Sequence, residues 1–172
     1  MKNTSLIPAL LLLAAMAATA QTKDPVSSAL REILPGRQKN TVAAVEAMPA
    51  DKFNFKPTAD QVTFGHLVVH MIESNNGFCS KVAGVPAPKV EEFKETDSKD
   101  KLVAGLKASF DFCSETLAKM DDSKLGETTE ALGTKLSRAR IALGIASSMA
   151  DHYAETAMYL RLNGIAPPTA KK

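Results

Sequence analysis

Four segments of the chain carry apolar residues at every third or fourth position, with polar residues between them. They run from about residue 24 to 48, 63 to 83, 98 to 120 and 136 to 162. In an α-helix this spacing places the apolar side chains on one face, where other helices can bury them. Few segments alternate in the way of a β-strand. The pattern therefore predicts an all-α fold, a four-helix bundle.

Proline and aromatic residues organise the first part of this bundle. Pro35–Gly36 interrupts the first apolar pattern, which predicts either a kink or a short helix followed by a longer one. Pro49 ends this helical segment. Residues 50–60 follow as an ordered connection, in which we expect Phe53 and Phe55 to seal one end of the core.

Capping and turn residues mark the other boundaries. Thr63 is a candidate N-cap for the second helix, and Gly84–Pro88 ends that helix. Either Asp97 or Ser98 caps the third helix. The polar segment Asp121–Thr134, which contains glycine, is then either a hairpin or a plain loop.

The N-terminus has the pattern of a signal peptide. Lys2 is followed by an apolar run over residues 6–18 and by the small residues Ala18-Thr19-Ala20, which form an A-x-A cleavage site. The run is shorter than the roughly 20 apolar residues of a membrane-spanning helix. We therefore expect residues 1–20 to be removed and residues 21–172 to form one exported domain, periplasmic or secreted, without a membrane span. Disulfide bonds persist in such compartments.

The numbers of charged residues and histidines limit the functions that the sequence can have. The chain has 21 Lys and Arg against 19 Asp and Glu, a net charge of +2. Nucleic-acid binding normally needs a clustered excess of basic residues, so we expect no nucleic-acid partner. Only His66, His70 and His152 can supply imidazoles to a metal or acid–base site.

Two parts of the sequence resemble a known family. The first is Met48–Thr58 followed by Phe64–His70, and the second runs from Asp151-His152-Tyr153 to the ending Tyr159–Pro168. In this order and at this separation they are similar to the DinB-like superfamily, over essentially all of residues 21–172.

The resemblance implies a fold and a metal site. It implies an antiparallel-type four-helix bundle, often a homodimer, in which three histidines from two helices bind a divalent metal at one end of the bundle. Some members use the metal to activate a small thiol for transfer, some are described as metal-dependent hydrolases, and most have no known activity. His70 and His152 match two of the three histidines, but the third falls on Ser148.

The substitution at Ser148 leaves two interpretations of this site. A neutral hydroxyl is a poor ligand for Zn²⁺ or Ni²⁺ compared with nitrogen or thiolate donors. His66, four residues before His70, is a candidate third ligand; otherwise it caps its helix or faces solvent. Glu73 and Glu155, each three residues after a matched histidine, are candidate partners for a ring N–H, or else ordinary exposed residues.

The two cysteines also have two interpretations. Cys79 and Cys113 fall on the second and third helices, where antiparallel neighbours would bring them together in a disulfide. They could instead be two separate buried thiols that behave as small apolar residues.

Two functions are therefore compatible with the sequence. The first is an exported DinB-like protein with a degenerate metal site, which binds an unidentified small molecule or partner without catalysis. The alternative is a hydrolase or group transferase that uses water or thiol activated by a divalent metal held by His70 and His152.

Overall fold

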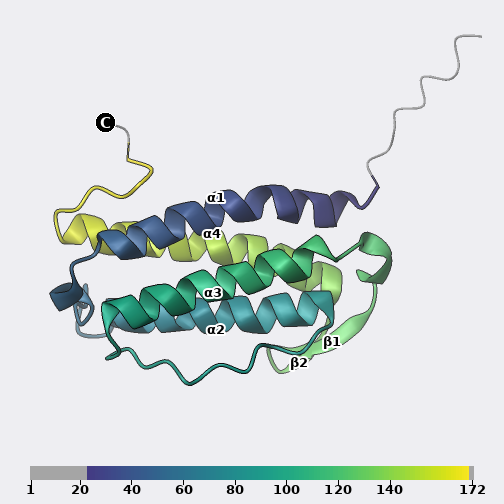
Figure 1. Ribbon diagram of the computed structural model, residues 1–172, viewed down its shortest axis with the longest axis horizontal. Helices are drawn as coiled ribbons and strands as arrows, with labels where there is room; N and C mark the ends of the chain where they lie inside the picture. Colours follow the sequence, from purple (N-terminus) through teal and green to yellow (C-terminus); the bar gives the residue numbers. More distant parts are fainter. Residues whose placement is uncertain (1–22, 171–172) are drawn as a thin grey trace, which may run out of the picture.

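Four α-helices carry the fold in the computed structural model, which describes residues 23–170 (Figure 1). The expected signal peptide, residues 1–20, lies outside the described residues. Two single-turn 3₁₀ helices and one β-hairpin complete the described structure. The bounds are α1 Pro25–Ala47, η1 Ala50–Lys52, α2 Phe64–Ala83, α3 Lys99–Ala118, η2 Asp122–Lys124, β1 Thr128–Ala131, β2 Thr134–Ser137 and α4 Arg138–Leu162. Among the described helices, none has the length and apolar character needed to cross a membrane.

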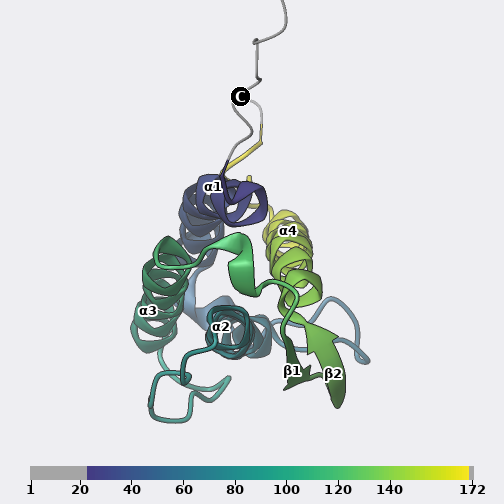
Figure 2. The ribbon, with the colours of Figure 1, turned by 90° about the vertical axis from the view of Figure 1, so that its right-hand side faces the viewer.

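The helices pack as a bundle in which α1 and α2 lie diagonally opposite each other. Each of them neighbours both α3 and α4, as the end view shows (Figure 2). The hairpin lies beside α2 and α4, at the end where α4 begins (Figure 2). The predicted all-α four-helix bundle is therefore confirmed, with the hairpin as its only described strand structure.

The bundle is not antiparallel throughout. The colours of Figure 1 show that α2 and α3 run in the same direction, joined by residues 84–98, which return along the length of the bundle. A hydrogen bond from Thr63, just before α2, to Glu95, just before α3, joins the starting ends of the two helices. Fifteen residues of extended chain reach about 50 Å, which exceeds the roughly 30 Å length of a 20-residue helix. The expectation of antiparallel neighbours is therefore wrong for this pair of helices.

This parallel arrangement brings the two cysteines together. Cys79 and Cys113 lie toward the C-terminal ends of α2 and α3, and a disulfide bond joins them with Cα atoms 5.2 Å apart. Both are fully buried.

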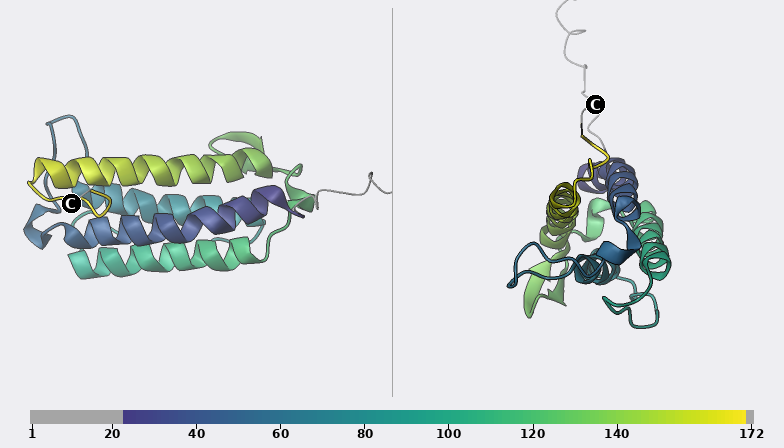
Figure 3. Two further views of the ribbon diagram at one scale, coloured as in Figure 1. Left: turned by 90° about the horizontal axis from the view of Figure 1, so that it is seen from above. Right: turned by 90° about the vertical axis from the view of Figure 1, so that its left-hand side faces the viewer.

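Helix α1 is continuous through Pro35, so the expected division into a short and a longer helix is wrong. Leu30 and Leu34 before the proline, and Val42 and Val45 after it, are all buried in the same core. Helix α1 runs beside α3 and α4 (Figure 3). Because both of its halves bury apolar side chains, packing holds the helix together despite the lost hydrogen bond.

A carboxylate from a distant segment caps the start of α1. Asp122 of η2 accepts hydrogen bonds from the backbone N–H groups of Val26 and Ser27, at 2.9 Å each. The Ser27 hydroxyl donates a further bond to it at 2.5 Å. These bonds join the N-terminus of α1 to the segment that follows α3.

Aromatic residues close the opposite end of the bundle, as expected for Phe53 and Phe55. The Phe53 ring packs edge-on against Phe64 at a centroid distance of 5.2 Å, and Phe55 packs against Tyr159 at 6.2 Å. The buried Tyr159 hydroxyl donates to the carbonyl of Val62 at 2.8 Å. Together these contacts hold the connection between α1 and α2 on the end of the core.

Capping explains most helix boundaries. Thr63 accepts from the backbone N–H of His66 at 2.9 Å, and Ser98, one of the two expected caps, accepts from Lys101 at 3.3 Å. The segment after α3 is the hairpin of the two expected alternatives, with Ala131 paired to Thr134. Helix α4 starts at Arg138 rather than near residue 136, because residues 134–137 form the second strand.

Candidate functional site

A cavity of about 680 Å³ opens between α2, α4 and the hairpin. This is within the usual range for small-molecule sites, roughly 300–1,000 Å³. Helices α2 and α4 run antiparallel, so the C-terminal part of α2 lies beside the start of α4 (Figure 1). The cavity therefore has two ends, one formed by the middle of α4 and one by its start together with the hairpin.

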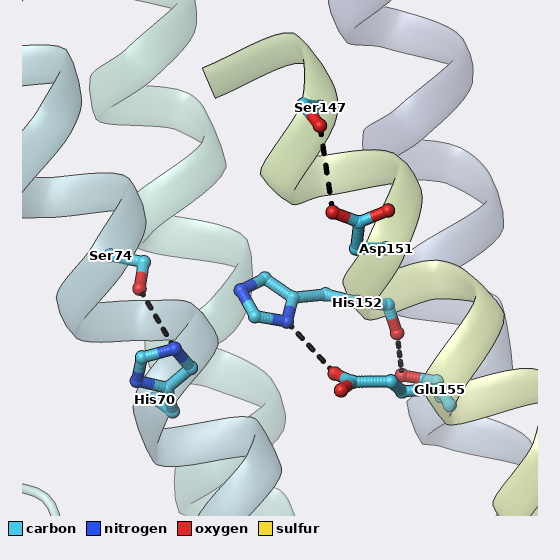
Figure 4. Close-up of polar contacts among 7 residues, drawn as sticks. His70, Ser74, Ser147, Asp151, His152 and Glu155 are labelled. Carbon is cyan, nitrogen blue, oxygen red and sulfur yellow. Dashed lines mark hydrogen bonds and ion pairs between the residues drawn. The ribbon is translucent and has the colours of Figure 1, made fainter. Parts of the chain in front are cut away.

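Two imidazoles meet at the first end. His70 of α2 and His152 of α4 extend toward each other across the space between the helices (Figure 4). Their ring centroids are 5.0 Å apart, and the ring planes are nearly perpendicular at 86°. His70 is exposed, whereas the His152 side chain is only 16% exposed.

Each imidazole has a partner on its own helix. Nδ1 of His152 lies 3.1 Å from Oε2 of Glu155, within hydrogen-bond distance, and Nε2 of His70 lies 3.4 Å from the hydroxyl of Ser74 (Figure 4). The contact with Glu155 turns Nδ1 of His152 away from the cavity, so Nε2 is the nitrogen left for a ligand.

Polar side chains surround the imidazoles. Ser148, one helical turn before His152, lines the cavity with both histidines, as do Glu73 and Asp151. Asp151 lies 3.5 Å from the hydroxyl of Ser147 (Figure 4).

The other end of the cavity is cationic and apolar. Lys81 of α2 and Arg140 of α4 line it. Apolar side chains from both helices and from the hairpin complete it, namely Phe78, Ala131, Leu132, Leu136 and Ile141.

Comparison with known proteins decides the family. The model of the DinB superfamily matches residues 34–156, which include His70, Ser148 and His152. The chain belongs to the DinB superfamily. The resemblance carried by the two sequence motifs is thus confirmed.

Solved structures of DinB-like proteins share the fold of this superfamily member. One is a DinB-like protein from Bacillus cereus ATCC 10987, with a TM-score of 0.68 and 12% sequence identity, over 84% of this chain and 97% of that chain. Another, from Bacillus subtilis, has a TM-score of 0.67 and 15% identity, over 84% of this chain and 98% of that one. No curated protein matches the sequence. At these identities the similarity concerns the fold.

The side chains of this DinB-superfamily protein do not fit a three-histidine metal site. Within residues 23–170, no three His, Cys, Asp or Glu side chains gather closely enough to hold a metal ion. The position one turn before His152, in the cavity that His70 lines from α2, holds Ser148. A hydroxyl that keeps its proton is a weak donor to Zn²⁺ or Ni²⁺.

The structure brings together His70, His152 and Ser148, but not His66. Nδ1 of His66 lies 3.9 Å from Oε2 of Glu95 in the connection before α3, and His66 does not line the cavity. Thr63, not His66, caps the helix, and the His66 side chain is 54% exposed, so His66 faces solvent, one of the alternatives expected for it. Glu155 contacts His152, whereas Glu73 is an exposed residue at the cavity wall.

Sequence reasoning missed the cationic end of the cavity. The signal lies in helical spacing, since His70, Ser74 and Lys81 are separated by four and seven residues and fall on one face of α2. Arg140, Gly144 and Ser148 repeat the pattern at four-residue steps on α4. Only the antiparallel pairing of the two helices shows that these faces meet.

Proposed function

We propose that this DinB-superfamily protein is an exported binding protein whose family metal site is degenerate. In this proposal the cavity between α2, α4 and the hairpin takes a small molecule and needs no resident metal. The observation that carries it is Ser148, which lines the same cavity as His70 and His152 in place of a third imidazole.

The donor set explains why the site would bind metal weakly. Two neutral imidazoles supply two nitrogen donors, and a metal site in a protein usually has three or four strong ligands. Without a third strong ligand, a metal ion held by His70 and His152 alone would exchange readily with solvent. The cavity itself has polar groups at one end and cationic and apolar groups at the other.

One observation favours the alternative, a metal-dependent hydrolase or group transferase. The contact of Glu155 with Nδ1 of His152 resembles the carboxylate–histidine pairs that orient metal ligands. The same contact also serves a metal-free site, because it fixes the orientation of the imidazole toward a bound molecule.

Binding of Zn²⁺ to wild type and to the variants Ser148→His and Ser148→Ala distinguishes the two functions. We expect wild type and Ser148→Ala to bind weakly and equally, since the hydroxyl adds little. Ser148→His should bind Zn²⁺ about 100-fold more tightly. The free energy of zinc binding at a complete site is about 10–16 kcal/mol, and each ligand contributes a share of it. Wild-type binding of one Zn²⁺ per chain as tight as that of Ser148→His would overturn the proposal and favour the metal-dependent enzyme.

Export and homodimer formation belong to the same proposal. Export is supported by the signal-peptide pattern before residue 21 and by the disulfide between Cys79 and Cys113. Cell fractionation of the full chain and light scattering of the purified protein test the two statements separately.

A further inference from the structure

The start of α4 places positive charge where a helix disfavours it. The first turn contains Arg138 and Arg140 but no acidic residue. Because the N-terminus of a helix has a partial positive charge, cations there are unfavourable unless something compensates them.

Only one of these two arginines has a compensating partner in the described structure. The guanidinium of Arg138 forms an ion pair with Glu127 at 2.8 Å. Arg140 has no ion pair within residues 23–170, and it lines the cavity. A residue that violates a local preference without structural compensation is a candidate functional residue.

A second cation lies at the same end of the cavity. Lys81 is in the last turn of α2, which lies beside the start of the antiparallel α4. The C-terminus of a helix favours a lysine, so Lys81 by itself needs no ligand. With Arg140, however, it gives this end of the cavity two positive groups.

The carboxylates of the cavity lie too far along the helices to neutralise these cations. Glu73 precedes Lys81 by eight residues, or about 12 Å of helix. Asp151 follows Arg140 by eleven residues, or about 16 Å. Both acids belong to the histidine end.

Apolar groups lie next to the cations, and one of them is unusual. Leu132 at the hairpin tip has a φ of 52° and is 73% exposed, yet it lines the cavity. A leucine in this left-handed conformation is unfavourable, and burial does not offset the penalty here. Phe78 and Leu136, which are partly buried, also line the cavity and add to its apolar surface.

We propose that the cavity binds an organic anion with an apolar body, whose charged group contacts Lys81 and Arg140 and whose body packs against Leu132, Leu136 and Phe78. This assignment rests on the proposed function of the cavity as a small-molecule site and specifies the chemical class of the molecule.

Three probes of equal chain length test the assignment: octanoate, octan-1-ol and octylamine, which are anionic, neutral and cationic at neutral pH. Calorimetric titration of the full mature chain should show octanoate binding most tightly. Arg140→Gln and Lys81→Gln should each weaken octanoate binding by about tenfold and leave octan-1-ol unchanged. Both side chains are exposed, so both variants should fold.

Lys135→Gln is the matched control, because Lys135 is an exposed lysine of the hairpin that does not line the cavity. It removes the same charge and should leave octanoate binding unchanged. If octanoate affinity falls equally in all three variants, the effect comes from the net charge of the protein and the assignment is overturned. Equal affinity for the three probes would overturn the anion assignment but keep the proposed function of the cavity as a small-molecule site. If none of the three probes binds, both the anion assignment and the proposed function are contradicted.

Discussion

The imidazoles of His70 and His152 meet edge to face, with ring centroids 5.0 Å apart, across the space between α2 and α4. This is a favourable packing geometry for two aromatic rings. It brings together the matched histidines of two sequence motifs, 82 positions apart in the chain, in the cavity that Ser148 also lines.

Replacing both cysteines, Cys79→Ser with Cys113→Ser, should destabilise the protein. A disulfide that closes a loop of this length, with a sequence separation of 34, contributes about 3–4 kcal/mol by restricting the unfolded chain. Denaturant unfolding of the oxidised wild type and of the double variant measures the difference. Free-thiol titration of the denatured wild-type protein is the control, and two reactive thiols per chain would contradict the bond.

Gly65 and Gly77 of α2 should respond oppositely to alanine. A Cβ at Gly65 would overlap the backbone carbonyl of Glu95, whereas nothing lies within 4 Å of a Cβ at Gly77. Gly65→Ala should therefore lower the free energy of unfolding by about 1–3 kcal/mol, as overpacking does. Gly77→Ala should raise it by up to about 1 kcal/mol through helix propensity. A stable Gly65→Ala protein would show that the connection before α3 does not pack as described.

The cap that Asp122 provides to α1 should make stability depend on pH. Burial acts to raise the pKa of Asp122, but hydrogen bonds from Ser27 and Val26 outweigh it and lower the pKa below its usual value. Its stabilising effect is therefore complete above the unfolded pKa of about 4 and is lost as the pH falls through the lower folded value.

Thermal unfolding of Asp122→Asn and Asp121→Asn at several pH values measures this effect. Asp122→Asn should have a lower Tm than wild type at pH 7. On acidification its Tm should fall by less than the Tm of wild type does. Among the residues that the structure describes, Asp121 accepts bonds only from the neighbouring Ser123, so Asp121→Asn should change Tm less. Equal changes in the two variants would mean that the cap does not tie α1 to η2.

Leu132→Asn should affect thermal stability and octanoate binding differently. Asparagine tolerates the left-handed conformation at this hairpin position better than leucine does, so Tm should stay the same or rise. Octanoate affinity should fall, because the variant removes apolar contact at the cavity. Unchanged affinity together with a raised Tm would show that Leu132 does not contact the ligand.

Helical periodicity was enough to predict the bundle because the buried positions, such as Leu102, Leu106 and Phe110, repeat at helical spacing. It could not show that α1 continues through Pro35, because that depends on the partners of Leu30 and Val42 in the fold. The parallel arrangement of α2 and α3 depends on the path of residues 84–98, whose mixed charges carry no periodic signal.

Part of the candidate site could also be predicted from the sequence. His70, His152 and Ser148 follow from motif positions, and the structure places them around one cavity. Lys81 and Arg140 belong to no motif, and their proximity arises from the antiparallel packing of α2 against α4. His66 shares a helix face with His70 by spacing, but its ring lies beside Glu95, which only the tertiary structure brings there.

The metal content of the wild-type protein, purified without chelator and measured by elemental mass spectrometry, shows whether the family metal site is degenerate. For a degenerate site we expect well below one transition-metal ion per chain in a protein that still binds octanoate. One zinc or nickel ion per chain, lost in His70→Ala and His152→Ala, would contradict the account and establish a metal centre.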